Sequence, residues 1–179
     1  LCGGISTDHE CVEENEISEK IAKGVYVHLR HGSATRNIVK NSKMVTPENM
    51  RRFIMCTDDR HASDLRLKGH LDDALRTVVA GGFNPVWAVT IATLNVAECY
   101  GLKYRGAIAP FYFADLVVVD DLKNFNAQYV FKEGKMVAKD GKPLFDTTKR
   151  YLPDAVLNTV NVKPFCADDF KITLKGEKA

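Results

Sequence analysis

Two hydrophobic periods follow one another along this chain of 179 residues. In residues 1–104, short apolar runs such as 25–29 and 53–56 alternate with segments whose apolar residues recur every three to four positions. In residues 105–179 the pattern becomes that of strands, with a β-branched run at 115–120. The first pattern is typical of βα units around a parallel sheet, so an α/β fold followed by a β-rich domain and tail is predicted.

Local signals place the individual elements. A helix is predicted around Ile17, Ile21 and Ala22 and ends near Gly24, and Thr46-Pro47 opens a brief helical turn. Asn84-Pro85 is a second cap-then-proline signal. The other predicted helices are 34–41, 71–80 and 85–100, and the other predicted strands are 5–7, 129–131 and 135–138 around a turn at 132–134, with 156–162 and 170–174 in the tail.

Composition excludes several classes of partner. The formal net charge is only +2, so no strong field favours nucleic acid. No apolar run approaches the roughly 18 residues that span a bilayer, and the start lacks the layout of a signal peptide, so no membrane contact and a cytoplasmic location are predicted. The five cysteines form no CxxC pair, which disfavours a cysteine zinc site. Because the chain opens without Met on an apolar, glycine-rich stretch, both ends are expected to lie inside a longer protein.

Polar clusters follow three successive predicted strands, at 8–10, 30–33 and 57–61. The carboxyl ends of parallel strands converge on one crevice, where functional groups gather. His9, flanked by two carboxylates, is the best candidate metal ligand, although it could be merely a polar loop residue. Asp58 could bind a metal, act as a general base or cap the helix that begins at Ala62. A catalytic metal takes about three protein ligands, and the sequence offers two convincing ones.

Other polar residues near these strand ends have weaker signals. Arg30 and Ser33 could orient a substrate, although an arginine at a strand end is commonly a surface ion-pair residue. His28 alternates with Tyr26 inside a strand and is interpreted as packing. His70 is interpreted as a structural or capping residue, and the roles of His31 and His61 stay open.

Several ordered motifs resemble those of bacterial and archaeal adenine deaminases of the amidohydrolase superfamily. A later motif resembles the superfamily's signature where its barrel leads into a β-sandwich domain. The first group consists of GISTDHE (4–10), RHGSATRN (30–37), VTPEN (45–49), CTDDRH (56–61) and GHLDD (69–73), and the later motif runs from GAIAP (106–110) to ADLVVVD (114–120).

The resemblance implies the C-terminal part of a metal-dependent hydrolase (β/α)8 TIM barrel, entered at about its sixth strand and followed by part of a β-sandwich domain. It implies that His9 is a metal ligand, and that Asp58 both binds metal and shuttles protons while a metal-bound hydroxide converts adenine to hypoxanthine and ammonia, a reaction of purine salvage. Arg30, Ser33 and Asp59 are the implied substrate-binding residues. The implied metal is manganese or iron, with zinc as a further option.

The resemblance also has departures. Relatives typically place Glu before the glycine of the Arg30 motif and Gly before the tyrosine of the later motif, where this chain has His31 and Phe111. The remaining metal ligands are expected in sequence that precedes residue 1, so this segment alone should be inactive unless a homo-oligomer or the N-terminal part of the barrel completes it. Two alternatives stay open. The first is another amidohydrolase, either dihydroorotase-like or imidazolonepropionase-like. The second is a non-catalytic fragment that acts as an interaction module.

Overall fold

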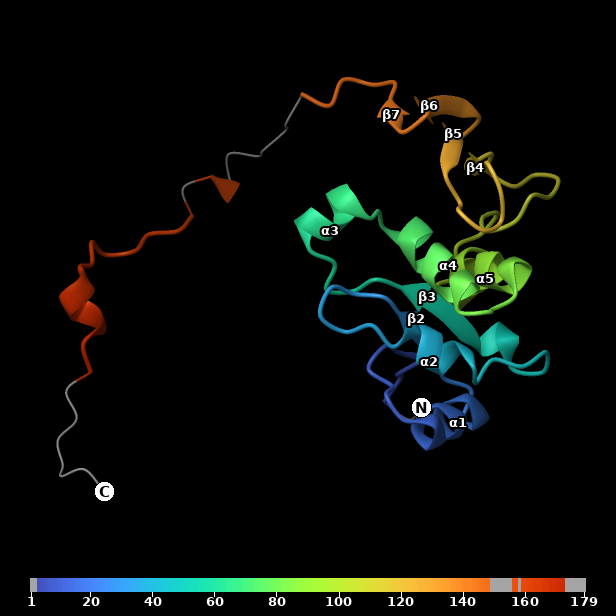
Figure 1. Cartoon of the computed structure of the whole chain (residues 1–179), viewed down its shortest axis with the longest axis horizontal. Coiled ribbons are helices and arrows are strands. Elements are labelled where there is room, and N and C mark those ends of the chain that lie inside the picture. The colour runs from blue at the N-terminus through green and yellow to red at the C-terminus, as the bar shows by residue number, and fades with distance from the viewer. Residues whose placement is uncertain (1–2, 149–155, 158, 173–179) are drawn as a thin grey trace. The chain divides into compact units, whose positions relative to one another are not determined.

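The computed structural model describes residues 3–148, 156–157 and 159–172 (Figure 1). The chain divides into two compact units, Leu1–Phe145 and Asp146–Ala179. All the residues of the predicted site lie in the first unit. The predicted boundary between residues 104 and 105 stays a prediction, since both patterns of secondary structure belong to that unit.

The first half of this unit contains a parallel sheet with the strand order β1-β2-β3. Helices connect the strands, as the βα pattern predicts. The register sets Asp8 opposite Val27 and Arg30 opposite Cys56. The strands are β1 (Thr7–Asp8), β2 (Tyr26–Arg30) and β3 (Phe53–Cys56), and the connecting helices are α1 (Glu14–Ala22), α2 (Ile38–Ser42) and the short 3-10 helix η1 (Met50–Arg52).

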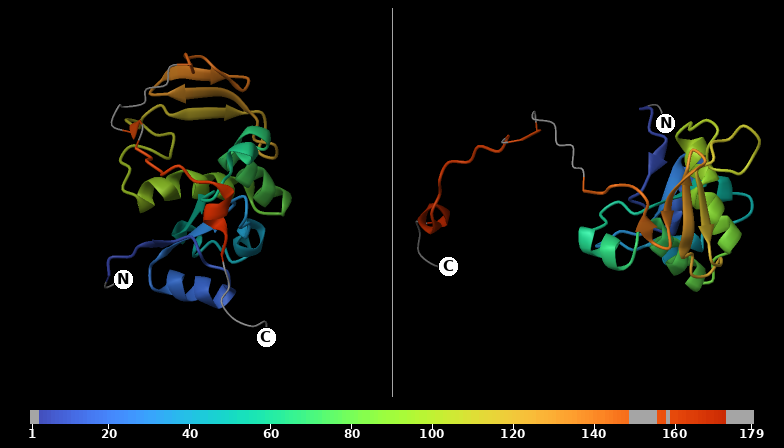
Figure 2. Two further views of the ribbon diagram at one scale, coloured as in Figure 1. Left: turned by 90° about the vertical axis from the view of Figure 1, so that its left-hand side faces the viewer. Right: turned by 90° about the horizontal axis from the view of Figure 1, so that it is seen from above.

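One face of this sheet carries the hydrophobic core. Val27 and Leu29 from β2 pack with Phe53 and Met55 from β3, and all four side chains are almost fully buried. Of the helices that follow β3, α5 (Pro85–Ala92) and α6 (Leu94–Cys99) contact β3, and α4 (Leu71–Ala80) and α5 contribute to the core (Figure 2). The helices α1, α2, α4 and α5 contribute Ile17, Ile38, Ala74, Val78, Ala88 and Ile91 to the core, whereas α3 (Ala62–Leu67) contributes no buried residue.

The second half of the unit is an antiparallel sheet with the order β4-β5-β6-β7. Glu133 and Gly134 join β5 to β6 with φ angles of 51° and 78°, the geometry of a two-residue hairpin turn. This turn confirms the predicted hairpin. The strands are β4 (Leu116–Val119), β5 (Ala127–Lys132), β6 (Lys135–Lys139) and β7 (Lys142–Pro143), the last of which the sequence did not predict.

Two helix predictions were wrong in their extent. The helix predicted over 34–41 begins only at Ile38, because Arg36 forms an isolated β-bridge with His31. The helix predicted over 85–100 breaks at Thr93, whose hydroxyl bonds back to the carbonyl of Val89 and whose ψ is −80°. Such back-bonding by Ser and Thr bends helices. Asn84 caps α5 as predicted, because its side chain accepts hydrogen bonds from two backbone amides of the first turn.

The strands predicted in the tail are not found at the residues that the structure describes. Position 156 has 3-10 helical structure, 157 lies in a turn, and 159–162 have no regular structure. Phe170 ends the 3-10 helix η3 (Ala167–Phe170), 171–172 have no regular structure, and 173–174 lie outside the described residues. Over the described part of the chain, no helix is long and apolar enough to cross a membrane.

Candidate active site

The pleat of the parallel sheet separates packing residues from polar residues. Because successive side chains of a strand point to opposite faces, His28 and Arg30 lie on the face away from the core that Val27 and Leu29 form. His9 directly follows β1, and Asp58 comes two residues after β3. The sheet thus collects these polar groups at its carboxyl ends, as the sequence predicts.

His9, Glu10 and Asp58 form a compact cluster. His9 Nε2 lies 3.8 Å from Asp58 Oδ1 and 3.2 Å from Glu10 Oε1. Each of the three residues offers an atom within 4.8 Å of the others, a spacing that allows one ion to reach all of them. An imidazole and carboxylates are a common donor set for catalytic divalent metals, so these residues fit the implied metal.

The backbone of Asp58 is held in an unusual conformation. Its φ angle is +50°, in the left-handed region that only Gly, Asn and Asp adopt readily. The Arg60 amide donates to the Asp58 carbonyl oxygen over 2.8 Å and closes a tight turn. Asp58 therefore does not cap α3, which begins at Ala62 without a side-chain cap, and that alternative was wrong.

Arg30 binds the carboxylates of this cluster. Its side chain is 8% exposed, and its guanidinium lies 2.5 Å from Asp58 Oδ2, 2.7 Å from Glu10 Oε1 and 3.3 Å from Asp59 Oδ1. Burial alone would lower the pKa of Arg30, but the hydrogen bond to Asp59 and the charge of Asp58 raise it above its ordinary value. The surface ion-pair interpretation was therefore wrong, because the guanidinium is buried and fixes one oxygen of Asp58.

Asp59 and Ser33 organise the loop after β2. Asp59 Oδ2 accepts from the Ala34 amide over 2.7 Å, and this bond, more than Arg30, lowers the pKa of Asp59. A Cβ on Gly32 would lie 1.6 Å from Asp59 Oδ1, so a larger residue there would displace the Asp59 carboxylate from its present contacts. Ser33 Oγ donates to Asp64 and accepts from the His61 amide, so its hydroxyl bonds to the 61–64 segment.

Two residues near the cluster carried weaker signals in the sequence. The only sequence signal for Glu10 is its place beside His9, yet its carboxylate reaches both His9 and Arg30. His28 was interpreted as packing, and it is buried as expected. Its ring centroid lies 6.0 Å from that of His9, and burial is the main reason that its pKa falls to about 4. The period-two pattern of β2 was the available signal that His28 shares a face with Arg30.

A second group of possible metal ligands, Asp8, Cys11 and Glu16, lies beside the first. The Lys20 ammonium contacts the Asp8 carboxylate, lies 2.6 Å from Glu16 Oε1 and 3.5 Å from Cys11 Sγ. Burial alone would lower the pKa of Lys20, but the hydrogen bonds to Asp8 and Glu16 raise it well above its ordinary value. The Lys20 ammonium therefore already occupies the position between these three side chains and balances the charge of the two carboxylates.

The fold and the cluster define an α/β protein with a candidate divalent-metal site at the carboxyl edge of a parallel sheet. Comparison with known families matches the Amidohydrolase family over residues 3–137, and the chain belongs to this family. The predicted α/β class and barrel-type fold are thereby confirmed. A β-aspartyl dipeptidase from Fervidobacterium islandicum shares the fold at a TM-score of 0.58 and 17% identity, over 76% of this chain and 39% of that one. An enamidase shares it at a TM-score of 0.57 and 16% identity, over 75% and 40%.

Several curated proteins that are similar to this chain in sequence are called adenine deaminases. The chain is 48% identical to an adenine deaminase of Nitratidesulfovibrio vulgaris over 170 residues, which are 95% of this chain and 29% of the relative. It is 40% identical to adenine deaminase 2 of Latilactobacillus sakei over 177 residues, which are 98% and 30% of the two chains. It is 42% identical to an adenine deaminase of Clostridium acetobutylicum over 96% of this chain and 30% of that one. The chain spans about three tenths of the length of these relatives.

Proposed function

We propose that this chain is part of a metal-dependent adenine deaminase, which hydrolyses adenine to hypoxanthine and ammonia. The observation that carries the proposal is the meeting of His9 and Asp58 at 3.8 Å, although 48 other residues separate them in the sequence. The naming of the relatives supports the substrate, since three of them at 40–48% identity are called adenine deaminases.

We propose His9 and Asp58 as metal ligands, with Glu10 within reach of the same ion. A bound divalent metal lowers the pKa of water, so that a nucleophile is available near neutral pH. The mixed imidazole and carboxylate set suits manganese or iron, and zinc as well. Arg30 holds Asp58 Oδ2 and so presents Oδ1 towards His9.

In the proposed reaction, Asp58 is the group that moves the proton. The oxygen of water forms a bond to C6 of adenine, and the bond from C6 to the exocyclic nitrogen breaks. Asp58 accepts one proton that water loses and passes it to the departing nitrogen, which leaves as ammonia, while the other water proton stays on the purine product. Arg30, Asp59 and Ser33 are proposed as the substrate-binding residues, because Arg30 and Asp59 lie beside Asp58 and the loop that carries Ser33 is bonded to Asp59. The cytoplasmic location and the homo-oligomeric state stay predictions.

Ammonia release by the full-length protein tests this function. The protein is stripped of metal and reloaded with Mn²⁺, Fe²⁺ or Zn²⁺, and ammonia and hypoxanthine are measured with adenine as substrate. Dihydroorotate and imidazolonepropionate serve as comparison substrates for the alternative amidohydrolases. The proposal predicts equimolar ammonia and hypoxanthine from adenine, and a metal-loaded protein that turns over only a comparison substrate would overturn it.

A further inference from the structure

The turn that carries Asp58 is anchored on both sides to one short segment of the chain. This segment, Gly69–Asp73, joins α3 to the first turn of α4. We propose that Gly69–Asp73 is a clamp that positions Asp58, with His70 and Asp73 as its positioning residues. The metal and backbone tests of this clamp need no substrate, and only its effect on turnover rests on the proposed function.

The first anchor lies directly before Asp58. Thr57 is almost fully buried, and its Oγ1 lies 2.8 Å from His70 Nε2. His70 is itself fixed, because its backbone amide donates to Asp72 Oδ1 over 2.7 Å at the start of α4. The residue that precedes Asp58 is thereby bound to the amino end of this helix.

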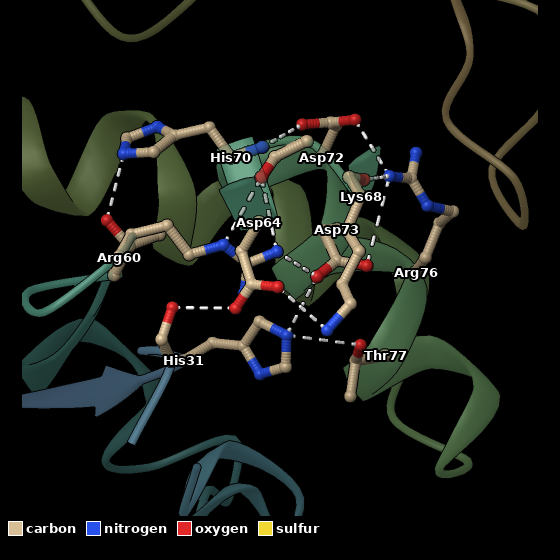
Figure 3. Close-up of polar contacts among 12 residues, drawn as sticks. His31, Arg60, Asp64, Lys68, His70, Asp72, Asp73, Arg76 and Thr77 are labelled. Carbon is tan, nitrogen blue, oxygen red and sulfur yellow. Dashed lines mark hydrogen bonds and ion pairs between the residues drawn. The ribbon is translucent and has the colours of Figure 1, made fainter. Parts of the chain in front are cut away.

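The second anchor lies two residues after Asp58. The Arg60 side chain is 2% exposed and donates to the Gly69 carbonyl oxygen through Nε and Nη2, over 3.3 and 3.1 Å. Arg60 Nη2 also binds Asp73 Oδ2. Figure 3 shows the Asp73 carboxylate between the side chains of Arg60 and His31.

Asp73 extends the clamp to the neighbouring strand end. His31 follows β2, and its Nε2 lies 3.1 Å from Asp73 Oδ2 and 3.5 Å from Thr77 Oγ1. Burial lowers the pKa of His31 more than Asp73 raises it, so the ring is neutral at pH 7 and donates from Nε2. Burial alone would raise the pKa of Asp73, but the hydrogen bonds from Arg60 and His31 lower it, so Asp73 is a carboxylate.

The conformation of Asp58 explains why such anchors matter. Asp tolerates φ +50° better than most residues but also adopts the commoner negative φ values, and here Thr57 and Arg60, on either side of Asp58, are bound in place by the clamp. A shift of about 1 Å at a reacting group lowers turnover by about 100-fold. Outer partners of metal ligands typically change metal affinity or activity by about 10- to 100-fold when they are removed.

The test removes each anchor from the full-length protein without altering Asp58. Thr57→Val deletes the hydroxyl with nearly the same shape, and Thr57→Ser keeps it. Asp73→Asn removes the charge that Arg60 and His31 bind. Asp115→Asn is the control, because Asp115 also binds an arginine, but in the antiparallel part of the chain.

Three properties are measured in each variant. They are the hydrogen–deuterium exchange of the backbone at 57–61, the Kd for Mn²⁺, and the steady-state constants kcat and KM for adenine. The clamp predicts faster exchange, a Kd about tenfold higher and a kcat at least about tenfold lower in Thr57→Val and Asp73→Asn, with KM within about threefold. Thr57→Ser and Asp115→Asn should match the wild type.

Unchanged exchange together with an unchanged Mn²⁺ Kd in Thr57→Val and Asp73→Asn would overturn the clamp. Faster exchange with unchanged Kd and kcat would also overturn it, since the segment would then be structural only. A wild-type protein that binds Mn²⁺ but leaves adenine intact would refute the proposed function, and exchange and Kd would still decide on the clamp.

Discussion

Two parts of this chain differ in what holds their side chains in place. The parallel part is residues 7–99, from β1 to α6, and the antiparallel part is residues 105–145, which contain β4 to β7. Every member of the hydrophobic core cluster lies between Cys11 and Ile91, around the parallel sheet. In the antiparallel sheet, all residues of β4 to β7 are described and none is buried. The strands of the antiparallel sheet therefore have a hydrogen-bonded register without buried side chains, whereas the strands of the parallel sheet have both a register and a hydrophobic core. Precise placement of functional groups requires such packing, which explains why the candidate site lies on the parallel sheet.

The largest difference between the two parts should appear when an aspartate with positive φ is changed in each. Asp58 and Asp140 have φ angles of 50° and 48°, and Asn tolerates this conformation equally well. Asp58→Asn should lower kcat for adenine by about 1,000-fold or more, because it removes a proposed ligand and proton acceptor. Asp140→Asn should stay within about twofold of the wild type. Steady-state ammonia release by both metal-loaded variants measures the difference, and full activity in Asp58→Asn would remove its proposed role.

A truncation in each sheet compares their packing. Leu29 is fully buried in the core of the parallel part, while Val118 of β4 is 43% exposed. Leu29→Ala should lower the free energy of unfolding by about 3 kcal/mol, and Val118→Ala by less than about 1 kcal/mol. Urea denaturation of both variants provides the values. Equal losses would show that the antiparallel sheet is packed in the full-length protein as tightly as the parallel one.

An arginine in each part compares their ion pairs. Arg30 is buried among Glu10, Asp58 and Asp59, whereas Arg105 binds Asp115 at a more exposed position. Arg30→Met should lower the free energy of unfolding by about 2 kcal/mol, because it leaves neighbouring carboxylates without their counter-charge. Arg105→Met should have an effect below about 1 kcal/mol. If the two variants unfold at the same urea concentration, Arg30 is not the counter-charge that its geometry indicates.

The smallest predicted effect is one of pH. All five histidines lie before residue 71, so sensitivity between pH 5 and 7 belongs to the parallel part. The pKa of His31 is lowered by burial, so the unfolded chain binds a proton more readily, and stability present above pH 6.5 is lost as the pH falls. His31→Gln should reduce this slope by up to about 1.4 kcal/mol per pH unit. Urea denaturation between pH 5 and 7 measures it, with His61→Gln, at an exposed position, as the control.

The sequence predicted those features of the fold that depend on neighbouring residues. The bounds of β3 and α4, the Asn84 cap and the hairpin turn at Glu133-Gly134 all follow from local periodicity or turn chemistry. At Arg36 and Thr93, local periodicity does not predict where the helix begins or ends. Arg36 leaves the helical pattern because its backbone pairs with His31, and Thr93 interrupts a continuous apolar helix pattern where its hydroxyl bonds back to the Val89 carbonyl.

The candidate site was predictable to a similar degree. Strand ends in a parallel sheet converge, and this rule alone places His9 near Asp58. The partners of these residues depend on contacts distant in sequence, such as that between Arg30 and Glu10 or between His31 and Asp73. The rule places residues at an edge, but it does not say which carboxylate an arginine binds.

The central claim is that the carboxyl edge of β1 to β3 holds a divalent metal. Anomalous diffraction from crystals of the full-length protein loaded with Mn²⁺ tests it directly. The claim predicts anomalous density at ligand distance, about 2 Å, from the Asp58 carboxylate and the His9 imidazole. Anomalous density only at other places, with both side chains free of metal, would contradict it.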